Sequence, residues 1–312
     1  MWLPGMLQCA RQPHPLPHPS RKDPGGIIMA IAPLPIAVST TALDPFDPAR
    51  HLPLFRDYGI SQVEISLNCE GYLRDEVRFR ELAGAIRGAG LEVNSVHVPF
   101  YSQTMGKLFS LSDPDVASRQ HALDWADRCL ERLLALEGRF LVVHPSAEPI
   151  ADEERPARVE RCREGISYLL SQLPANGVRI AVECLPRTCL GHDSQELLDI
   201  LAPLPAERLG ICLDVNHANL REDLLTATRR YGSRILTLHL SDNDGVDERH
   251  WLPLQGIIPW REWVPALLAT GFAGPLLYET APRERGSEQP LEARVALARI
   301  QENAGRLVAF SG

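Results

Sequence analysis

Two short apolar stretches, Arg179-Ile-Ala-Val-Glu183 and Leu209-Gly-Ile-Cys-Leu-Asp214, each end in a carboxylate. Ile235-Leu-Thr-Leu-His239 and Pro275-Leu-Leu-Tyr-Glu279 repeat the pattern and end in a histidine and a glutamate. Such ends are unexpected, because burying an unpaired carboxylate among apolar side chains costs a large amount of free energy. Four metal-ligand-type residues at the ends of four apolar runs indicate that these side chains meet in one metal site.

Outside these runs, short apolar stretches alternate with amphipathic ones along the chain, which predicts repeated βα units. The predicted strands cover residues 36–40, 62–67, 91–97, 140–144 and 177–183, followed by three runs that end at Asp214, His239 and Glu279. The predicted helices cover residues 48–58, 75–88, 114–136, 153–173, 194–201, 220–231, 260–270 and 291–309. Ser194 is expected to cap the N-terminus of its helix. The strands are rich in Val, Ile and Leu without strict alternation, as expected when both faces of a parallel sheet are covered.

Eight such units in a chain of 312 residues favour one closed (β/α)₈ TIM barrel, an α/β fold that typically needs about 250 residues. The predicted barrel domain spans residues 31–312, and no linker divides it. An open doubly wound sheet is the alternative. That fold normally carries a glycine-rich first βα turn, and Ser39-Thr-Thr-Ala-Leu-Asp44 contains no glycine.

Residues 1–30 differ from the rest of the chain and are predicted to form a disordered leader. They are rich in proline and lack the continuous apolar segment of a signal peptide. No run in the chain approaches the ~18 apolar residues of a membrane span. The seven cysteines contain no Cys-x-x-Cys pair. We therefore expect a cytoplasmic protein with reduced thiols and no membrane partner.

The composition argues against several classes of function. The net charge of −8 is unlike that of a nucleic-acid-binding protein, which usually presents a basic face. Only Lys22 and Lys107 among the 32 basic residues are lysines, and neither falls in a predicted strand. A Schiff-base aldolase or a pyridoxal enzyme is hard to build without a strand lysine.

In a (β/α)₈ barrel all strand C-termini meet at one face, which carries the active site. Histidines join the run-ending residues there: His97 and His144 end two earlier strands, His217 closely follows Asp214, and His250 lies in the loop after the seventh strand. Carboxylates and imidazoles together suit Mn²⁺ or Zn²⁺, with Mg²⁺ or Co²⁺ as alternatives, and not Ca²⁺, which prefers oxygen ligands. A lone glutamate or histidine at a strand end is more often structural, but so many at one rim favour a metal site.

From Val38 to its C-terminus the chain resembles the xylose-isomerase-like TIM barrel superfamily. That group includes sugar-phosphate isomerases and epimerases, inosose dehydratases and the metal-dependent apurinic/apyrimidinic (AP) endonucleases of family 2. The matching stretches are Ser95–Phe100, Val142–Ser146, Val182–Arg187, Gly210–His217, Leu238–Asp242, Arg249–Gly256 and Ile258–Trp260. The resemblance implies metal ligands at Glu183, Asp214, His239 and Glu279 and auxiliary positions at His97, His144, His217 and His250. In the endonucleases those histidines and a further carboxylate, matched here by Glu248, assemble three zinc ions.

The chain departs from both branches of the superfamily. Cys184-Leu-Pro-Arg187 and Val215-Asn-His217 replace the Gly/Ala-rich segment and the Thr-Cys-His of the endonucleases. Glu183-Cys-Leu-Pro186 and His97-Val-Pro-Phe100 look more like the isomerase and epimerase branch. Pro253-Leu-Gln-Gly256 stands where that branch usually has Pro-Gly-Glu-Gly, so a carboxylate near the site is missing. The resemblance therefore indicates the class of reaction and not the particular substrate.

The resemblance and the ligand set predict a divalent-metal-dependent isomerase or epimerase of a sugar, sugar phosphate or polyol-like hydroxy-carbonyl compound. Glu183 and Glu279 would remove and return a proton through a metal-stabilised enediolate. His217 and Arg249 would hold substrate oxygens. The expected partner is a small sugar-like molecule rather than nucleic acid, and barrels of this kind often form homo-oligomers.

Three alternatives stay open. A metal-dependent phosphoester hydrolase resembling the AP endonucleases would use further ions at His97, His144, Glu248 and His250. An inosose-type dehydratase would use the same rim for elimination of water. A non-catalytic barrel that binds a partner is the third, and the completeness of the ligand set argues against it.

Overall fold

The computed structural model describes residues 34–43, 47–66, 70–102, 106–175, 177–281, 283–287 and 289–311. The predicted leader, residues 1–30, lies outside the described residues. In the described part of the chain, no helix has both the length and the apolar composition that a bilayer span requires.

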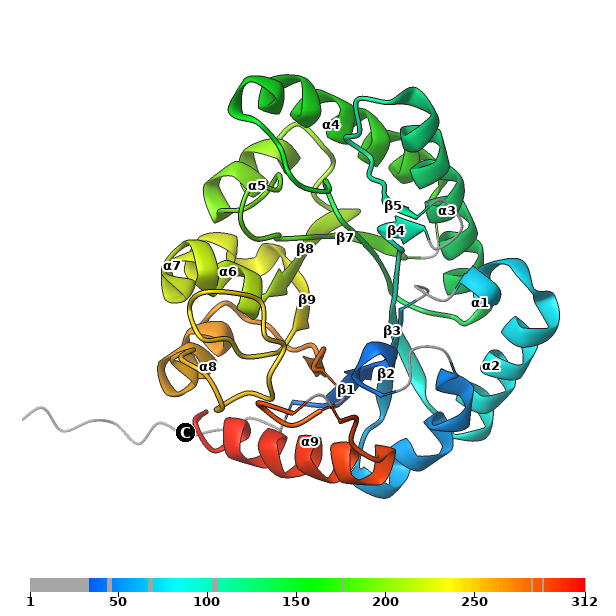
Figure 1. Ribbon diagram of the computed structural model, residues 1–312, viewed down its shortest axis with the longest axis vertical. Coiled ribbons are helices and arrows are strands. Elements are labelled where there is room, and N and C mark those ends of the chain that lie inside the picture. The colour runs from blue at the N-terminus through cyan, green and yellow to red at the C-terminus, as the bar shows by residue number, and fades with distance from the viewer. Residues whose placement is uncertain are drawn as a thin grey trace, which may run out of the picture. The chain divides into compact units, whose positions relative to one another are not determined.

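Eight parallel strands form one sheet in the order β10-β1-β2-β3-β6-β7-β8-β9 (Figure 1). Their bounds are β1 Ile36–Ser39, β2 Gln62–Ser66, β3 Glu92–His97, β6 Phe140–Val143, β7 Arg179–Glu183, β8 Leu209–Asp214, β9 Ile235–His239 and β10 Leu276–Tyr278. The sheet closes on itself through Leu240, just beyond β9, which bridges to Tyr278 in parallel. The Leu240 amide donates to the Leu277 carbonyl at 2.8 Å, and the Glu279 amide donates to the Leu240 carbonyl at 3.1 Å. The predicted closed barrel is confirmed.

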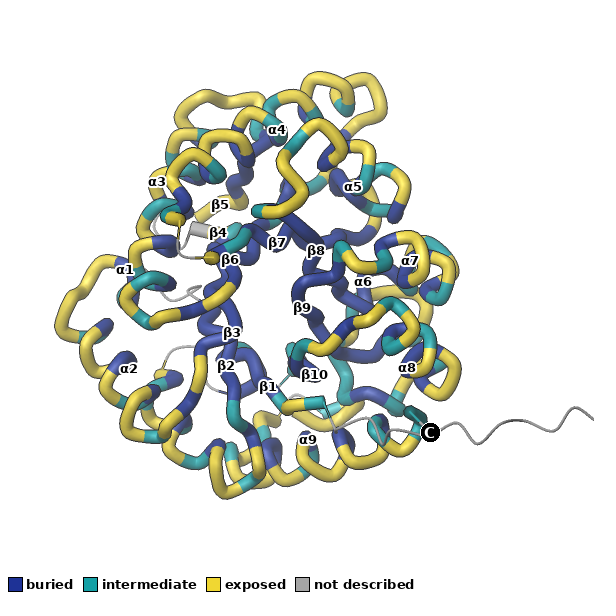
Figure 2. The backbone as a smooth tube through the Cα atoms, turned by 180° about the vertical axis from the view of Figure 1, so that it is seen from behind, coloured by how far each residue is buried: buried dark blue, intermediate teal, exposed yellow. Residues whose placement is uncertain are grey.

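Helices cover the outer side of the barrel, with their exposed faces pointing away from the buried strands (Figure 2). The α-helices are α1 Glu70–Arg74, α2 Glu76–Gly88, α3 Val116–Ala135, α4 Arg155–Gln172, α5 Ser194–Leu201, α6 Val215–Arg221, α7 Leu224–Tyr231, α8 Trp260–Ala269 and α9 Ala293–Val308. Short 3₁₀ helices are η1 Thr40–Ala42, η2 Pro48–Arg50, η3 Leu52–Tyr58, η4 Asp152–Glu154 and η5 Gly232–Arg234. A small hairpin, β4 Tyr101–Ser102 and β5 Lys107–Leu108, follows β3.

Three local predictions were wrong. The helix expected at 48–58 consists of the 3₁₀ turns η2 and η3, each with a proline in its first turn. The helix expected at 220–231 is divided, because α6 ends before Glu222 and Asp223 caps α7 by accepting from the Thr226 amide. Asp193, not Ser194, caps α5, and the Ser194 hydroxyl instead donates to Glu222.

The interior of the barrel is apolar on one side and polar on the other. An apolar cluster inside it comprises Phe140, Val142, Ala181, Cys212 and Leu236. On the side of β2 and β3, Glu64, Asn94 and Ser95 are fully buried. Asn94 reaches across to β9, where its side-chain amide donates to Thr237 Oγ1 at 2.8 Å. Because TIM-barrel interiors are usually filled by bulky apolar residues, the polar side indicates a functional interior.

Gly210 in β8 provides a test of the packing inside the barrel. A Cβ atom there would lie 2.5 Å from Leu236 Cγ and 2.6 Å from the Arg234 carbonyl oxygen. We expect Gly210→Ala to lower the free energy of unfolding by about 1–3 kcal/mol in urea denaturation, because the backbone oxygen cannot move aside cheaply. Gly84→Ala is the control: this position in α2 is open, and alanine should raise the stability by up to about 1 kcal/mol. Equal stability of the two variants would contradict this view of the packing.

Candidate metal centre and active-site cavity

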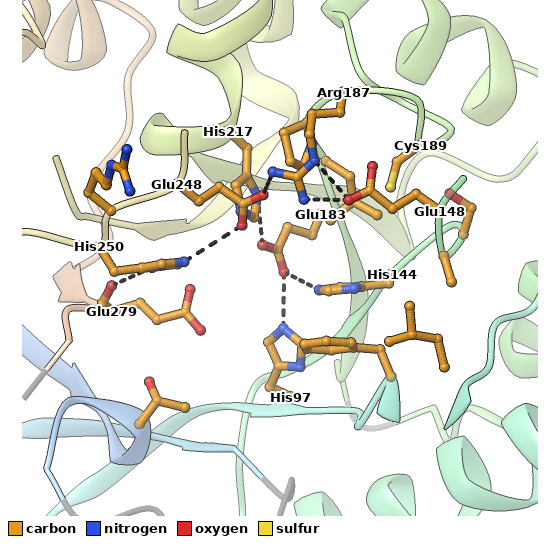
Figure 3. A pocket seen from close by; sticks show the side chains of 18 of the residues that line it. His97, His144, Glu148, Glu183, Arg187, Cys189, His217, Glu248, His250 and Glu279 are labelled. Atoms are coloured by element: carbon orange, nitrogen blue, oxygen red, sulfur yellow. Dashed lines mark hydrogen bonds and ion pairs between the residues drawn. The ribbon is translucent and has the colours of Figure 1, made fainter. Parts of the chain in front are cut away.

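The C-terminal ends of the strands open into a cavity of about 540 Å³ (Figure 3). The predicted site residues that line the cavity are His97, His144, Glu183, His217, Glu248, Arg249, His250 and Glu279. Asp214 and His239 are fully buried next to Glu183 and Glu279. The structure therefore brings all of the predicted site residues to one end of the barrel.

The four predicted metal ligands form one tight cluster. Glu183, Asp214, His239 and Glu279 each offer a ligand atom within 4.8 Å of the others. His239 Nδ1 is common to these contacts, at 3.1 Å from Glu279 Oε2, 3.3 Å from Glu183 Oε1 and 3.9 Å from Asp214 Oδ2. Four strands in succession around the barrel, β7, β8, β9 and β10, supply these residues.

The donor set of this cluster fits a divalent ion. Asp214 Oδ1 accepts from the His217 backbone amide at 2.9 Å, and His239 Nε2 lies 3.1 Å from Glu64 Oε2. The other atom of each group, Asp214 Oδ2 and His239 Nδ1, is buried and makes no hydrogen bond of good geometry among the described residues, although Glu279 Oε2 lies 3.1 Å from Nδ1. Unpaired buried polar atoms are costly, and a cation between them would pair both.

Imidazoles surround Glu183 and favour its charged form. His97 Nε2 and His144 Nε2 lie 3.0 Å and 3.2 Å from Glu183 Oε2, and His217 Nδ1 lies 3.3 Å from Oε1. Burial alone would raise the pKa of Glu183, but His239, His144 and the other imidazoles outweigh it and hold the pKa well below its usual range. Glu183 is therefore a carboxylate at neutral pH.

The other two buried ligands respond to their surroundings in different ways. At Asp214 burial prevails and raises the pKa to about 6. Burial opposes protonation of His239 as well, but the side chains of Cys212, Glu279 and Glu64 outweigh it and raise the pKa of His239 well above its usual value. In the metal-free protein a proton thus supplies positive charge to the cluster.

A second group of ligand-type side chains lies beside the first. His217, Glu248 and His250 offer ligand atoms within 4.8 Å of one another. Glu248 Oε2 is 3.1 Å from His217 Nε2 and 3.7 Å from His250 Nε2. Arg187 pairs with Glu248 and also with Glu148, whose Oε1 accepts from Arg187 Nε at 2.8 Å. This group has the residues for a further ion, but Glu248 already has cationic partners.

Arg249 lines the cavity, as expected of a residue that holds substrate, but its guanidinium is engaged elsewhere. Its Nε donates to Asp244 Oδ2 at 2.8 Å, and Asp247 lies 3.9 Å from its Nη1. Arg249 would have to leave these partners in order to hold a substrate oxygen.

Two residues of the site were missed in the sequence. Glu64 is in the middle of β2 and not at a strand end, so the pattern of charged residues that end apolar runs does not include it. The carboxylate within Gln62-Val-Glu-Ile-Ser66 was the one signal that could have indicated it. Arg187 has a positive φ of 54°, a backbone feature that the sequence around Pro186 does not reveal.

Comparisons with known proteins agree with this fold. The family model described as xylose isomerase-like TIM barrel matches residues 52–301. A D-psicose 3-epimerase from Ruminiclostridium cellulolyticum is 26% identical over 219 residues, which cover 68% of this chain and 71% of that protein. The structure of a D-tagatose 3-epimerase-like protein superposes with a TM-score of 0.74 at 19% identity, covering 89% of this chain and 98% of that chain. An AP endonuclease of family 2 from Brucella melitensis superposes with a TM-score of 0.69 at 19% identity, covering 85% and 97%.

The affinity of this cluster for Mn²⁺ is expected to rise with pH. Burial raises the pKa of Asp214 to about 6, so below that pH a proton occupies the carboxyl and the metal must displace it. Each displaced proton changes the apparent affinity by up to about tenfold per pH unit. With a pKa of about 6, the charged fraction of Asp214 rises about fourfold between pH 5.5 and 7.5, so titration calorimetry should show at least about fourfold weaker binding at the lower pH. Asp214→Asn is expected to reduce both affinity and pH dependence, and an affinity of the unmodified protein that does not change with pH would contradict the assignment.

Proposed function

Because the chain belongs to the xylose isomerase-like TIM barrel family, we propose that it is a divalent-metal-dependent isomerase or epimerase of a sugar or sugar-like hydroxy-carbonyl compound. The observation that carries the proposal is a pair of carboxylates, Glu183 and Glu279, which line the cavity and share a cluster of ligand atoms with Asp214 and His239. The similarity to a D-psicose 3-epimerase supports both the reaction and the substrate class.

The two glutamates suit proton transfer at a carbon atom next to a carbonyl. Burial would raise the pKa of Glu279, but His239 outweighs it and lowers the pKa to about 2, and the pKa of Glu183 is also low. Each is thus available to accept a proton at neutral pH. Since they come from different strands and both reach the cavity, one would take the proton and the other would return it.

His217 is a positively charged group beside one of the two glutamates. Burial lowers the pKa of His217, but Asp214, Glu183 and Glu248 outweigh it and raise the pKa well above its usual value. Its Nδ1 lies 3.3 Å from Glu183 Oε1 and 3.1 Å from the Cys184 carbonyl oxygen. A protonated His217 would therefore keep Glu183 in the charged form that accepts the substrate proton, and its place in the cavity lining would let it hold a substrate oxygen.

Glu183, Asp214, His239 and Glu279 would hold the ion. When bound, a divalent ion supplies Lewis-acid polarisation of the substrate carbonyl, which makes the neighbouring carbon more acidic. Three carboxylates and one imidazole favour Mn²⁺ slightly over Zn²⁺, with Mg²⁺ and Co²⁺ as alternatives.

Glu183→Gln tests the proposed proton transfer. The amide cannot accept the proton, so turnover of D-psicose or D-tagatose, followed by NMR, should fall by at least about a hundredfold. Circular dichroism should show an unchanged fold. The matched control is Glu76→Gln on the surface of α2, where the exposed side chain pairs only with Arg132 among the described residues, and this variant should keep its activity. Turnover by Glu183→Gln at the rate of the control would refute the role of Glu183.

The metal content separates this function from the runner-up, phosphoester hydrolysis. The groups His217–Glu248–His250 and His97–Glu183–His239 are the observations that favour additional ions and hydrolysis. Elemental analysis after loading with Mn²⁺ or Zn²⁺ is expected to find close to one ion per chain, because His97 and Glu248 already have partners in the protein. A content near three ions per chain, with cleavage of a phosphoester and no sugar turnover, would contradict the proposal. An inosose-type dehydratase would be recognised by loss of water from its product.

A further inference from the structure

Glu64 is a fully buried carboxyl group that the proposed proton transfer does not use. It lies in the middle of β2, and its side chain reaches His239 at the end of β9; the two strands face each other across the barrel (Figure 2). Its Oε2 atom lies 3.1 Å from His239 Nε2 and accepts from the Ser95 hydroxyl at 2.7 Å. Glu64 thus contacts the Nε2 side of the His239 ring, whereas the Nδ1 side faces the other candidate ligands.

Irregular strand pairing places Ser95 next to Glu64. In the β2–β3 pair, Val63 lies opposite Val93 but Glu64 lies opposite Ser95, so Asn94 is an extra residue in β3. Such a bulge redirects side chains. Here the Asn94 side-chain amide donates to Ser95 Oγ at 3.1 Å and to Thr237 Oγ1 at 2.8 Å.

The bonds from Asn94 fix both ends of this polar group. Thr237 and His239 are two residues apart in β9, so they point to the same face of the strand. Asn94 joins Thr237 to Ser95, and Ser95 donates to Glu64, which in turn contacts His239. The group is therefore anchored to β9 at two positions and to β2 and β3 between them.

The contact between Glu64 and His239 decides which ring nitrogen is free for a metal. A carboxylate accepts hydrogen bonds, so the proton belongs on Nε2 and the lone pair on Nδ1. Nδ1 is the nitrogen that faces Glu183, Asp214 and Glu279, at 3.1–3.9 Å. Without Glu64 the ring could take the other tautomer or turn, and the metal would lose its only imidazole within the four-residue cluster.

We propose that Glu64 is a positioning residue of the metal centre, which holds the His239 ring in the orientation and tautomer that bind a divalent ion. The inference rests on the proposed metal-dependent function. It extends the centre beyond its four ligands to a fifth buried carboxyl group, on the opposite side of the barrel.

The test is the affinity of purified full-length variants for Mn²⁺, measured by titration calorimetry without substrate. Glu64→Ala removes the acceptor and should weaken binding about 10- to 100-fold, and Glu64→Gln, which keeps an uncharged acceptor, should weaken it less. The matched control is Gln62→Met, two residues away in β2, whose side chain contacts Glu92 and not His239. The control should bind Mn²⁺ as tightly as the unmodified protein.

Two further readouts separate positioning from general support of the fold. The visible spectrum of Co²⁺-loaded protein reports the geometry of its ligands and should change in both Glu64 variants but not in Gln62→Met. The metal-free Glu64→Gln protein should still fold, but with a lower Tm, because protonated His239 loses the charge of Glu64 beside it. The Co²⁺ spectra are therefore compared well below the Tm of each variant.

Variants of Glu64 that bind Mn²⁺ within about twofold of the unmodified protein, with the same Co²⁺ spectrum, would overturn this inference alone. So would weak binding that leaves the Co²⁺ spectrum of both Glu64 variants unchanged. If the unmodified protein binds neither Mn²⁺ nor Zn²⁺, the proposed function fails and the inference fails with it. These outcomes are distinguishable because the affinity of the unmodified protein is measured first.

Discussion

The convergence of three carboxylates on one buried imidazole is the constraint on which the rest of this structure depends. Glu183, Asp214 and Glu279 meet around His239 Nδ1, where little water is present to screen their mutual repulsion. Such an arrangement needs a positive charge. In the metal-free protein protonated imidazole provides it, as the raised pKa of His239 indicates. A divalent ion would replace this single positive charge with two and leave the neutral imidazole free as a ligand. The raised pKa of His239 and the proposed metal binding therefore have the same cause, the three carboxylates around the ring.

The closed barrel fixes the relative positions of these four side chains. Each ligand lies at or just beyond the end of a strand whose backbone is fixed by pairing on both sides, and the bridge between Leu240 and Tyr278 closes the ring. The interior below the site is divided between an apolar cluster and a polar side built from β2 and β3. The irregular pairing at Asn94 brings polar groups to the level of the metal centre. The site is therefore supported from within the barrel as well as from the loops above it.

Much of the fold and the clustering of the four candidate ligands could be predicted from the sequence, because apolar runs that end in a charged residue are rare and the end of a strand fixes the position of its last side chain. Asp214 and His239 were found in this way. Glu64 was missed, because its importance comes from a partner 175 residues away in the chain. The cap of α5 was assigned to Ser194 instead of Asp193, since both are good capping residues and only the extended backbone of Asp193 decides between them. Local sequence thus predicts strand ends well but cannot predict contacts across the barrel.

The central claim is that Glu183 and Glu279 move a carbon-bound proton of a sugar-like substrate in a metal-dependent reaction. The most direct measurement is deuterium uptake from D₂O by a panel of ketoses, inososes and keto-acids incubated with the Mn²⁺-loaded protein, detected by NMR. We expect deuterium at the carbon next to the carbonyl of at least one ketose, in both the remaining substrate and its isomer, and no uptake after removal of the metal. Isomerisation without any uptake of deuterium, or uptake that continues in the metal-free protein, would contradict it.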